Sequence, residues 1–521
     1  MSETLNMAPS RAVEEPYPPL SLTSAESEQL IASIKDWSIA HGLAVRPPPA
    51  VVSAEADPLG ILATTAPVTL FPSPFPRVCF EQAKSIQKAY NQLYASIAQD
   101  EDFLQAIVQE IIEVDEFIAE LWQVHLKVKK EGYVQNLSLG LFRSDYMVHQ
   151  STTDHAPTIK QVEFNTIASS FGGLSSQTSE LHKYLSLSEY PLLEKNLQTK
   201  DMSLPENKST RFLASGLRAA FDFYTKSETS HPCCILFVVQ NPERNIFDQR
   251  HLEYELQQHG TPVFRLPFEE TLTRTSIEDT PRRQLLYYPP SNPSKVFEVA
   301  VVYFRAGYGP GDYPDESAWK ARLQMERSNA IKCPTILTQL AGAKKVQQVL
   351  ATPTSPSMPS IITRFIESGT SSIQGLEDTF TNIYPLDDTP AGLAARKLAT
   401  DPAKCQGYVL KPQREGGGNN IYRSAIPPFL AALPESHWKS FILMEIIIPP
   451  PVHNLILRNG VLEQGGVICE LGVYGTCLWD QVSKEVLHNE EAGYLLRTKG
   501  DKSEEGGVAA GFGSMDSCRL V

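Results

Sequence analysis

The stretch LKPQREGGGNNIY, residues 410–422, places a lysine, an arginine and a glutamate directly before three glycines and two asparagines. The apolar residues before it favour a strand, whose two-residue period puts Lys411, Gln413 and Glu415 on one face if the strand continues. Lysine suits phosphate oxygens, glutamate is a hard ligand for Mg²⁺, and glycines let backbone N–H groups approach phosphate closely. The patterns GxxxxGK[ST] and GxGxxG are missing from it, so this stretch alone fits a hairpin loop with solvated charges as well as a phosphate-binding loop.

A second polar stretch, QVEFNTIASSFGG at residues 161–173, holds two candidate metal ligands. Glu163 and Asn165 are two residues apart on an expected strand, so both side chains lie on one face and offer oxygen to a hard cation. On spacing alone, an edge strand with two exposed polar residues is the stronger interpretation.

A third stretch, LLRTKGDKSEEGGVAAGFGS at residues 495–514, combines cations with a loop of small residues. Arg497 and Lys499 alternate onto one strand face, and the loop after them lacks apolar anchors. Such a loop fits a mobile lid over a site, and a flexible tail fits equally well.

Two arginines stand in segments that are expected to be extended, Arg143 in LFRSDYM and Arg305 in YFRAGY. A planar guanidinium suits a ligand carboxylate, although an internal salt bridge is the better interpretation for either residue taken singly. No Ser/His/Asp order or HExxH pattern supplies a nucleophile or a zinc site. Hard-cation ligands, several cations and glycine-rich loops together indicate phosphate-activating chemistry with Mg²⁺.

Length, composition and charge narrow the class of protein. With 521 residues, 42% of them hydrophobic and 20% charged, the chain fits two domains or one large domain with an inserted module. A net charge of −14 without a Lys/Arg-rich block argues against nucleic acid as a partner. Apolar runs far shorter than the roughly 20 residues of a membrane span, and a start without a secretory signal, predict a cytoplasmic protein with no membrane segment. The eight cysteines lack metal-ligand spacing, so we expect reduced, mostly buried thiols.

Hydrophobic patterns predict the order of elements in the first half of the chain. Thr23 and Glu26 form a capping-box pattern that opens an amphipathic helix ending at Gly42. Residues 101–130 carry one long apolar helical stripe. Strands are expected at 137–148 and from residue 159, and the second strand runs into a Ser/Gly-rich loop.

The second half divides into three patterns. Residues 232–343 alternate strands and helices as βαβ units do, which indicates an inserted α/β module. Residues 351–400 are rich in Ser, Thr and Pro, and we expect them to lie on the outside as a connector. From residue 407 the pattern is rich in strands, with Asn459-Gly460 as a type I′ hairpin signal.

Taken together, these stretches closely resemble eukaryotic glutathione synthetase, a family of ATP-grasp ligases. They run in order from about residue 141 to 511, nearly three quarters of the chain: LFRSDYM, QVEFNTIASSFGGLSS, ERNIFDQR, VVYFRAGY, CPTILTQLAGAKKVQQ, VLKPQREGGGNNIY, LMEII, ELGVYG and LLRTKGDKSEEGGVAAG. The first 100 residues are compatible with the family but carry little motif weight. A string such as KPQREGGGNN, together with the other stretches, is highly specific for this family.

The resemblance implies a reaction and a fold. ATP phosphorylates the cysteinyl carboxylate of γ-glutamylcysteine, and the amine of glycine then attacks the acyl phosphate to give glutathione, ADP and phosphate. The implied architecture is an ATP-grasp fold of mixed α/β layers with three parts: a body of residues 1–231 and 344–521, an inserted α/β substrate-binding domain at 232–343, and a glycine-rich lid at about 495–514. A homodimer, with ATP as co-substrate and Mg²⁺ as cofactor, is also implied.

The resemblance also implies roles for particular residues. By similarity, the Mg²⁺ ligands are Glu163, Asn165 and Glu415. The residues expected to contact the nucleotide are Glu163, Lys344, Lys411, Gly416, Gly417, Asn420, Tyr422, Met444, Glu445, Ile447, Glu470 and Lys499. The residues expected to contact the dipeptide are Arg143, Ala168, Ser169, Ser170, Asn245, Gln249, Arg305 and Tyr308, with Arg497, Val508 and Ala509 closing over it. The residues expected to act on the reacting groups are Arg143, Lys411, Arg497 and Lys499.

Two positions depart from the family pattern. Ala168 stands where a serine is expected, and Ala306 stands where an aspartate is common. The doubled alanine in GGVAAG is associated with glycine as the amine, and a related ligase that uses β-alanine is an alternative. A catalytically silent nucleotide-binding protein on the same scaffold is a second alternative, which would require loss of a metal or phosphate ligand such as Glu163, Lys344 or Lys499.

Overall fold

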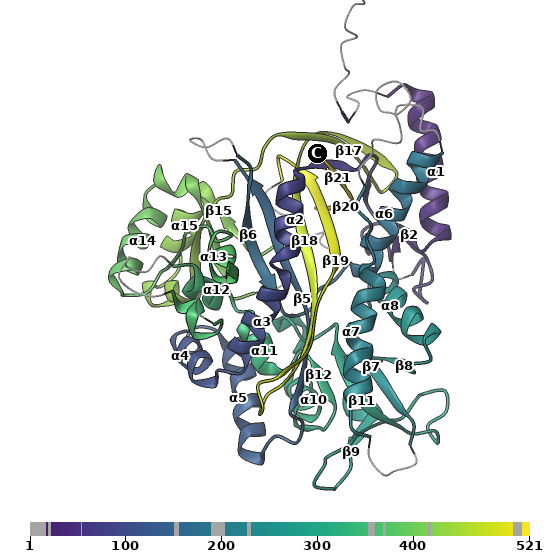
Figure 1. Cartoon of the computed structure of the whole chain (residues 1–521), viewed down its shortest axis with the longest axis vertical. Coiled ribbons are helices and arrows are strands. Elements are labelled where there is room, and N and C mark those ends of the chain that lie inside the picture. The colour runs from purple at the N-terminus through teal and green to yellow at the C-terminus, as the bar shows by residue number, and fades with distance from the viewer. Residues whose placement is uncertain are drawn as a thin grey trace, which may run out of the picture.

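The chain folds into α/β layers around one large mixed sheet, as the computed structural model shows (Figure 1). The structure describes residues 17–18, 22–53, 55–150, 156–188, 204–226, 231–352, 360–367, 371–414, 418–503 and 513–521. The mixed α/β class expected from the sequence is therefore confirmed.

Thirteen strands form the main sheet. They are β3 (Val68–Thr69), β5 (Leu137–His149), β6 (Thr158–Asn165), β7 (Cys233–Val239), β8 (Val263–Pro267), β9 (Thr275–Ile277), β10 (Leu285–Tyr287), β11 (Phe297–Phe304), β12 (Ile331–Cys333), β17 (Val452–Arg458), β18 (Val461–Asp480), β19 (Val486–Gly500) and β20 (Ser514–Asp516). The order is β17-β3-β20-β19-β18-β5-β12-β11-β10-β9, with β6 beside β5, β7 beside β11 and β8 beside β7. Antiparallel pairs join β6, β5, β18 and β19, whereas β5, β12, β11, β7 and β8 are joined by parallel pairs.

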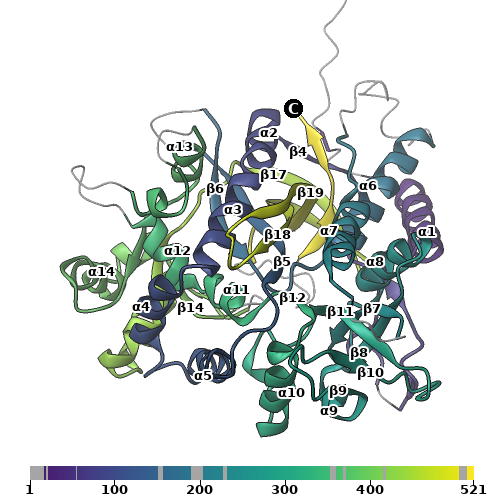
Figure 2. The same ribbon diagram turned by 60° about the horizontal axis from the view of Figure 1, so that its bottom comes forward.

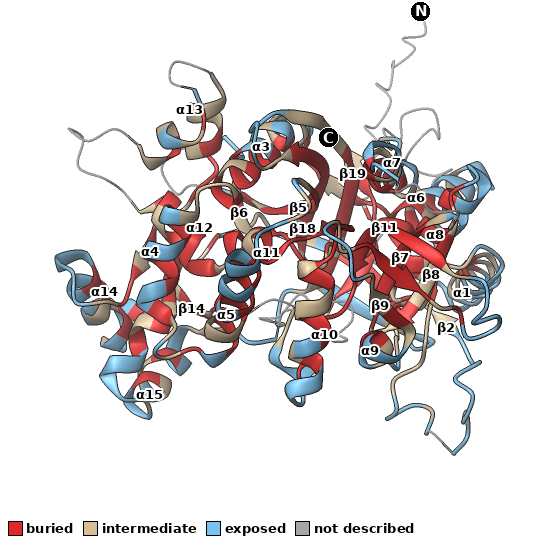
Figure 3. Ribbon diagram, turned by 90° about the horizontal axis from the view of Figure 1, so that it is seen from below, coloured by how far each residue is buried: buried red, intermediate tan, exposed pale blue. Residues whose placement is uncertain are grey.

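Helices cover both faces of this sheet, because its central strands are apolar on both sides. The α-helices of the described chain, of which α14 and α15 pack on the small sheet described below, are α1 (Ser24–Ala40), α2 (Arg77–Ser85), α3 (Gln87–Ala98), α4 (Glu101–Ile111), α5 (Glu116–Glu131), α6 (Gly172–Leu187), α7 (Ser209–Phe223), α8 (Ile246–Gln258), α9 (Thr271–Arg274), α10 (Glu316–Arg327), α11 (Ile336–Ala341), α12 (Lys344–Ala351), α13 (Ser371–Glu377), α14 (Pro390–Thr400) and α15 (Ile426–Ala431). Apolar residues of α2, α3 and α4 share one core with β5, β6 and β18, while those of α1, α6, α7 and α8 share another. Figure 2 shows α3 and α7 on either side of β18, and Figure 3 shows the strands as mostly buried between the helices.

A small separate sheet contains the two ends of the stretch LKPQREGGGNNIY, in β14 and β15. Its strands, in the order β13-β16-β14-β15, are β13 (Ile383–Pro385), β16 (Phe441–Glu445), β14 (Tyr408–Pro412) and β15 (Ile421–Tyr422). Leu410 faces α14 and α15, whereas Val409 and Met444 lie in the core shared with α3 and β6. Two-residue alternation therefore turns Lys411, on the same side as Val409, toward the main sheet.

Two further pairs of short strands complete the described fold. β1 (Ala44–Val45) pairs with β2 (Thr64–Thr65), and β4 (Ser73–Phe75) pairs in parallel with β21 (Cys518–Leu520). The second pair ties the C-terminal strand to the start of the α2–α3 segment.

Most of the predicted elements are confirmed. The capping box of Thr23 and Glu26 opens α1, and the hairpin between β17 and β18 turns at Asn459 and Gly460, whose φ angles are 50° and 79°. Both residues are left-handed, as a type I′ turn requires. The strands predicted at 137–148 and 159 onward are β5 and β6, and the helix predicted from Asn245 is α8.

Two expectations are wrong. The apolar stripe of 101–130 is divided between α4 and α5, because the Asp115 side chain accepts a hydrogen bond from the Ile118 N–H (3.1 Å) and starts a new helix. The segment 351–400 is not an external connector in its described part, since Leu376 and Ile383 are fully buried and β13 belongs to the small sheet.

The predicted insert at 232–343 contains β7 to β12, and these strands continue the main sheet through the pairing of β12 with β5. Its standing as a separate domain stays a prediction. All eight cysteines lie in described residues and are free thiols, and seven of them are buried, as expected. Within the described chain, no helix has the length and apolarity to cross a membrane.

Candidate functional site

Glu163, on β6, lies at the centre of a cluster of cations. The Nζ atom of Lys344 lies 3.1 Å from a Glu163 carboxylate oxygen, and the Nζ atom of Lys411 donates to the carbonyl of the neighbouring Val162 (2.8 Å). Burial alone would raise the pKa of Glu163, but four cations, Lys344, Lys411, Arg497 and Arg143, hold it well below its usual range. The carboxyl is therefore ionised, and 24% of its side-chain surface stays open to a ligand.

These cations come from four separate elements that the fold brings to one place. Lys344 begins α12, and Lys411 projects from β14 of the small sheet toward β6. Arg143 lies opposite Asn165 on the β5–β6 ladder, and Arg497 lies opposite Glu470 on the β18–β19 ladder. The candidate site thus occupies the space where the small sheet faces the main sheet.

Asp145 organises the main-sheet side of the cluster. Arg143 donates to both of its carboxylate oxygens (2.6 and 2.8 Å), and Arg497 and the Asn165 amide donate to one of them (2.9 and 3.1 Å). Arg497 also pairs with Glu470. The internal salt bridge that the sequence favoured for Arg143 is therefore present, and its partner is two residues along the same strand.

The remaining predicted nucleotide residues that the structure describes come from the small sheet and the residues just after β16, and from β18 and β19 of the main sheet. Met444 and Ile447 are buried in the core that the small sheet shares with β6, and Asn420 donates to the Tyr422 hydroxyl (3.3 Å). Lys499 is half-buried on β19, opposite Ile468. Their roles at a nucleotide stay predictions.

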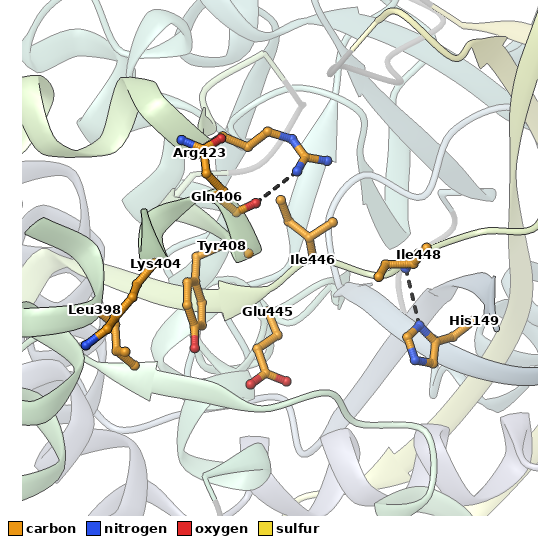
Figure 4. Close-up of a pocket in the computed structure, with 10 residues that line it drawn as sticks. His149, Leu398, Lys404, Gln406, Tyr408, Arg423, Glu445, Ile446 and Ile448 are labelled. Atoms are coloured by element: carbon orange, nitrogen blue, oxygen red, sulfur yellow. Dashed lines mark hydrogen bonds between the residues drawn. The ribbon is translucent and has the colours of Figure 1, made fainter. Parts of the chain in front are cut away.

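The Glu445 side chain points away from the Glu163 cluster. Its carboxylate accepts from Asn382 (3.0 Å) and lines a cavity of about 530 Å³ together with Tyr408, Lys404, Arg423 and His149 (Figure 4). This cavity lies at the end of β14 and β16 that is farther from Lys411.

A second cluster gathers the residues predicted to bind the dipeptide. Arg305, at the end of β11, donates to the Ser170 hydroxyl (2.8 Å), and the Ser170 carbonyl accepts from Arg143 (3.1 Å). The Ser169 hydroxyl donates to the carbonyl of Leu141, and Ala168 is half-buried in the same turn. The turn at 168–170 is thereby fixed between the two arginines.

Several buried polar atoms of this second cluster lack a hydrogen-bond partner among the described residues. They are the side-chain oxygens of Asn245 and Gln249 and the Nε atom of Arg305. Burial, together with Asp312 and Glu243, raises the pKa of the nearby Tyr308 to about 12, so its hydroxyl stays neutral. Unpaired buried acceptors and donors are costly, so their convergence indicates a place where a polar ligand supplies the partners.

Five predicted residues lie outside the described part of the chain: Glu415, Gly416, Gly417, Val508 and Ala509. In the part that is described, no group of three or more His, Cys, Asp or Glu side chains is placed to hold a metal. The predicted Mg²⁺ set of Glu163, Asn165 and Glu415 is therefore represented by its first two members.

Sequence reasoning missed the residues that hold the site together. Asp145 and Asp248 pair with the two predicted arginines, and the Tyr474 hydroxyl donates to the Ser170 carbonyl (2.7 Å). Only Asp145 left a local signal, because it follows Arg143 by two residues and therefore shares its strand face. Arg414, which had no predicted role, pairs with Asp115 at the start of α5.

Comparison with known proteins identifies the family of the chain. The family model described as "Eukaryotic glutathione synthase, ATP binding domain" matches residues 24–520. The glutathione synthetase large chain of Schizosaccharomyces pombe is 42% identical over 517 residues, covering 96% of this chain and 98% of that protein. The glutathione synthetase of Homo sapiens is 38% identical over 496 residues, covering 94% and 96%. The solved apo structure of a glutathione synthetase-like effector from Globodera pallida has the same fold, with a TM-score of 0.71 at 20% identity and coverage of 97% and 99%. The chain therefore belongs to the eukaryotic glutathione synthase family.

Proposed function

We propose that this protein is an ATP-dependent ligase that joins γ-L-glutamyl-L-cysteine to glycine and so makes glutathione. The observation that carries the proposal is the convergence of Lys344, Lys411, Arg143 and Arg497 on the ionised Glu163. The cluster sets these four cations against the carboxylates of Glu163, Asp145 and Glu470. This arrangement suits the phosphates of ATP, because the cations can neutralise charge that moves during phosphoryl transfer. The names of the relatives support the same product.

The residues present fit a bound Mg²⁺. Mg²⁺ is usually held by one or two protein carboxylates together with substrate phosphates and water, and Glu163 offers a partly exposed, ionised carboxylate. Asn165 lies beside it with its amide nitrogen turned to Asp145. Glu163 and Asn165 would hold the ion, with Glu415 as the third predicted ligand, and the ion would neutralise charge on the phosphates.

The reaction needs positioned substrates more than a protein nucleophile. A cysteinyl carboxylate oxygen attacks the γ-phosphorus of ATP, ADP leaves, and an acyl phosphate forms. The glycine amine attacks the acyl carbon, loses a proton, and expels inorganic phosphate. Lys344, Lys411 and Lys499 stabilise the phosphates, while Arg143 and Arg497 face the reacting carboxylate at the junction of the two clusters.

The second cluster suits the γ-glutamyl end of the dipeptide. A planar guanidinium at Arg305 suits the α-carboxylate, and the unpaired oxygens of Asn245 and Gln249 suit the α-ammonium group. Tyr308 and the 168–170 turn would line the same subsite.

Finer features of the architecture belong to the proposal as well. The small sheet facing the main sheet suits an ATP-grasp arrangement, with adenine beside Met444 and Ile447 and the ribose beside Glu470. Residues 232–343 would act as the substrate-binding module, and the protein would work as a cytoplasmic homodimer. The glycine-rich lid, with Val508 and Ala509, stays a prediction from the sequence.

A steady-state assay of ADP release tests the function. Purified protein with ATP, Mg²⁺, γ-glutamylcysteine and glycine should release ADP and form glutathione in equal amounts, and omission of the dipeptide should abolish release. β-Alanine in place of glycine should be a poor substrate. No ADP release with either amine, or a preference for β-alanine, would overturn the proposal.

A further inference from the structure

Asp248, on α8, is a fully buried carboxylate that touches each of the segments forming the proposed dipeptide subsite. One of its oxygens accepts from the backbone N–H groups of Gly173 (2.7 Å) and Leu174 (3.3 Å) at the start of α6. The other accepts from the Phe171 N–H (2.8 Å) and from Asn245 (3.2 Å). Arg305 approaches that same oxygen at 3.3 Å.

These bonds hold a backbone conformation that would otherwise be strained. Phe171, just before α6, has φ 74° and ψ 10°, a left-handed conformation that a bulky residue rarely adopts. The Asp248 carboxylate fixes the N–H of this residue and also interacts favourably with the N-terminal end of the helix. The turn at 168–170 that precedes Phe171 is therefore held in one geometry.

Close packing between α6 and α8 makes the contact between Asp248 and the start of α6 possible. A Cβ atom added to Gly173 would lie 2.4 Å from the Asp248 carbonyl oxygen and 2.9 Å from the His251 side chain. Only glycine therefore lets the start of α6 come this close to α8. Any larger residue at 173 would push the 168–173 segment away from Asn245 and Gln249.

The charge of Asp248 also fits Arg305. The guanidinium is buried, its contacts with Asp248 are long at 3.3 and 3.4 Å, and its Nε atom has no partner among the described residues. Asp248 thus neutralises Arg305 without using up its hydrogen-bonding capacity. A guanidinium in this state keeps donors available for a second carboxylate.

We propose that Asp248 is a positioning residue that assembles the dipeptide subsite by fixing the 168–173 turn, Asn245 and Arg305 relative to one another. This inference rests on the proposed function, because it concerns the affinity for γ-glutamylcysteine. Asp248 acts through these neighbours and leaves the phosphate cluster at Glu163 untouched. Its loss should therefore weaken dipeptide binding selectively.

The test compares Asp248→Asn with Glu298→Gln. Glu298 is also a fully buried carboxylate; it lies at the opposite end of β11 from Arg305 and accepts from the Tyr224 hydroxyl (2.7 Å). The Asn side chain keeps one acceptor oxygen but presents N–H groups to Phe171 or Arg305. Because hydrogen bonds to charged groups contribute about 1.5–3 kcal/mol each, we expect the KM for γ-glutamylcysteine to rise about 10- to 150-fold. The KM for ATP should stay within about twofold, and Glu298→Gln should leave both constants within about twofold.

A second variant keeps the inference falsifiable if Asp248→Asn does not fold. Gly173→Ala leaves the carboxylate intact but forces α6 and α8 apart, so it should give the same dipeptide-selective rise in KM. Equal changes in the KM for ATP and for the dipeptide, or an unchanged dipeptide KM in the folded variants, would overturn the inference. A wild-type protein that does not consume the dipeptide would instead refute the proposed function.

Discussion

Lys344 and Lys345 begin the same helix, and their side chains reach different acids, so they form a matched pair for testing the phosphate site. Lys344 lies 3.1 Å from Glu163, whereas Lys345 lies 2.9 Å from Glu110 and 3.3 Å from Asp387. Both side chains are nearly inaccessible, at 5% and 3% exposure. Their intrinsic helix propensity and burial are thus alike, and only the direction of the charge differs.

Lys344→Gln should weaken ATP binding because it removes one buried cation from the four around Glu163. A charge-assisted hydrogen bond to phosphate is worth about 1.5–3 kcal/mol, which corresponds to a rise of about 10- to 150-fold in the KM for ATP. Loss of the cation should also move the pKa of Glu163 back toward its usual range. Lys345→Gln should lower the melting temperature while leaving the KM for ATP within about twofold.

Steady-state ADP release at saturating γ-glutamylcysteine and glycine measures these constants, with thermal unfolding as the control for folding. An ATP KM for Lys344→Gln within twofold of the wild type would refute the assignment of Lys344 to the phosphates. An equal rise in Lys345→Gln would show that loss of buried charge at α12, rather than a phosphate contact, produces the effect.

Three further outcomes concern stability. Asp115→Ala removes the cap of α5 and the partner of Arg414, so the free energy of unfolding in urea should fall by about 1–3 kcal/mol; a change below about 0.5 kcal/mol would contradict this. Burial lowers the pKa of His182 from 6.5 to about 4, so the unfolded state binds more protons between these values. Stability should therefore fall by about 3 kcal/mol as pH falls through this window, and His182→Gln should flatten the dependence; parallel curves would refute it. Gly460→Ala, at φ 79°, should cost about 1–2 kcal/mol in the same assay, and a neutral result would contradict the turn assignment.

Local patterns predicted the elements whose signals lie within a few residues. The capping box before α1, the continuous apolar run of β7 and the Asn459-Gly460 turn each specify a local geometry that tertiary contacts do not override. The division of the 101–130 stripe was missed because hydrophobic periodicity continues across the break. The one local sign of this break in the sequence was Asp115. Its side chain caps α5 and binds Arg414, which lies 299 residues further along the chain.

The sequence predicted which residues belong to the candidate site more fully than it predicted which residues pair with one another there. Spacing placed Glu163 with Asn165 and Arg497 with Lys499, and the ladders confirm that these pairs lie on β6 and β19. Spacing along the sequence does not show which distant residues pair with each other. The role of Asp248 therefore depends on the folded structure, which brings α6, α8 and the end of β11 together. Gln413 shows the same limit, because its side chain binds the Lys345 N–H and the Ser440 carbonyl rather than facing a ligand.

The fate of one oxygen atom tests most directly whether the reaction passes through an acyl phosphate. The dipeptide is prepared with ¹⁸O in the cysteinyl carboxylate and turned over with ATP and glycine. If the cation cluster at Glu163 promotes formation of an acyl phosphate, each inorganic phosphate released carries one oxygen from that carboxylate. Mass spectrometry of the phosphate should therefore show one ¹⁸O per molecule, in step with the glutathione formed. Unlabelled phosphate accompanying glutathione formation would contradict the account.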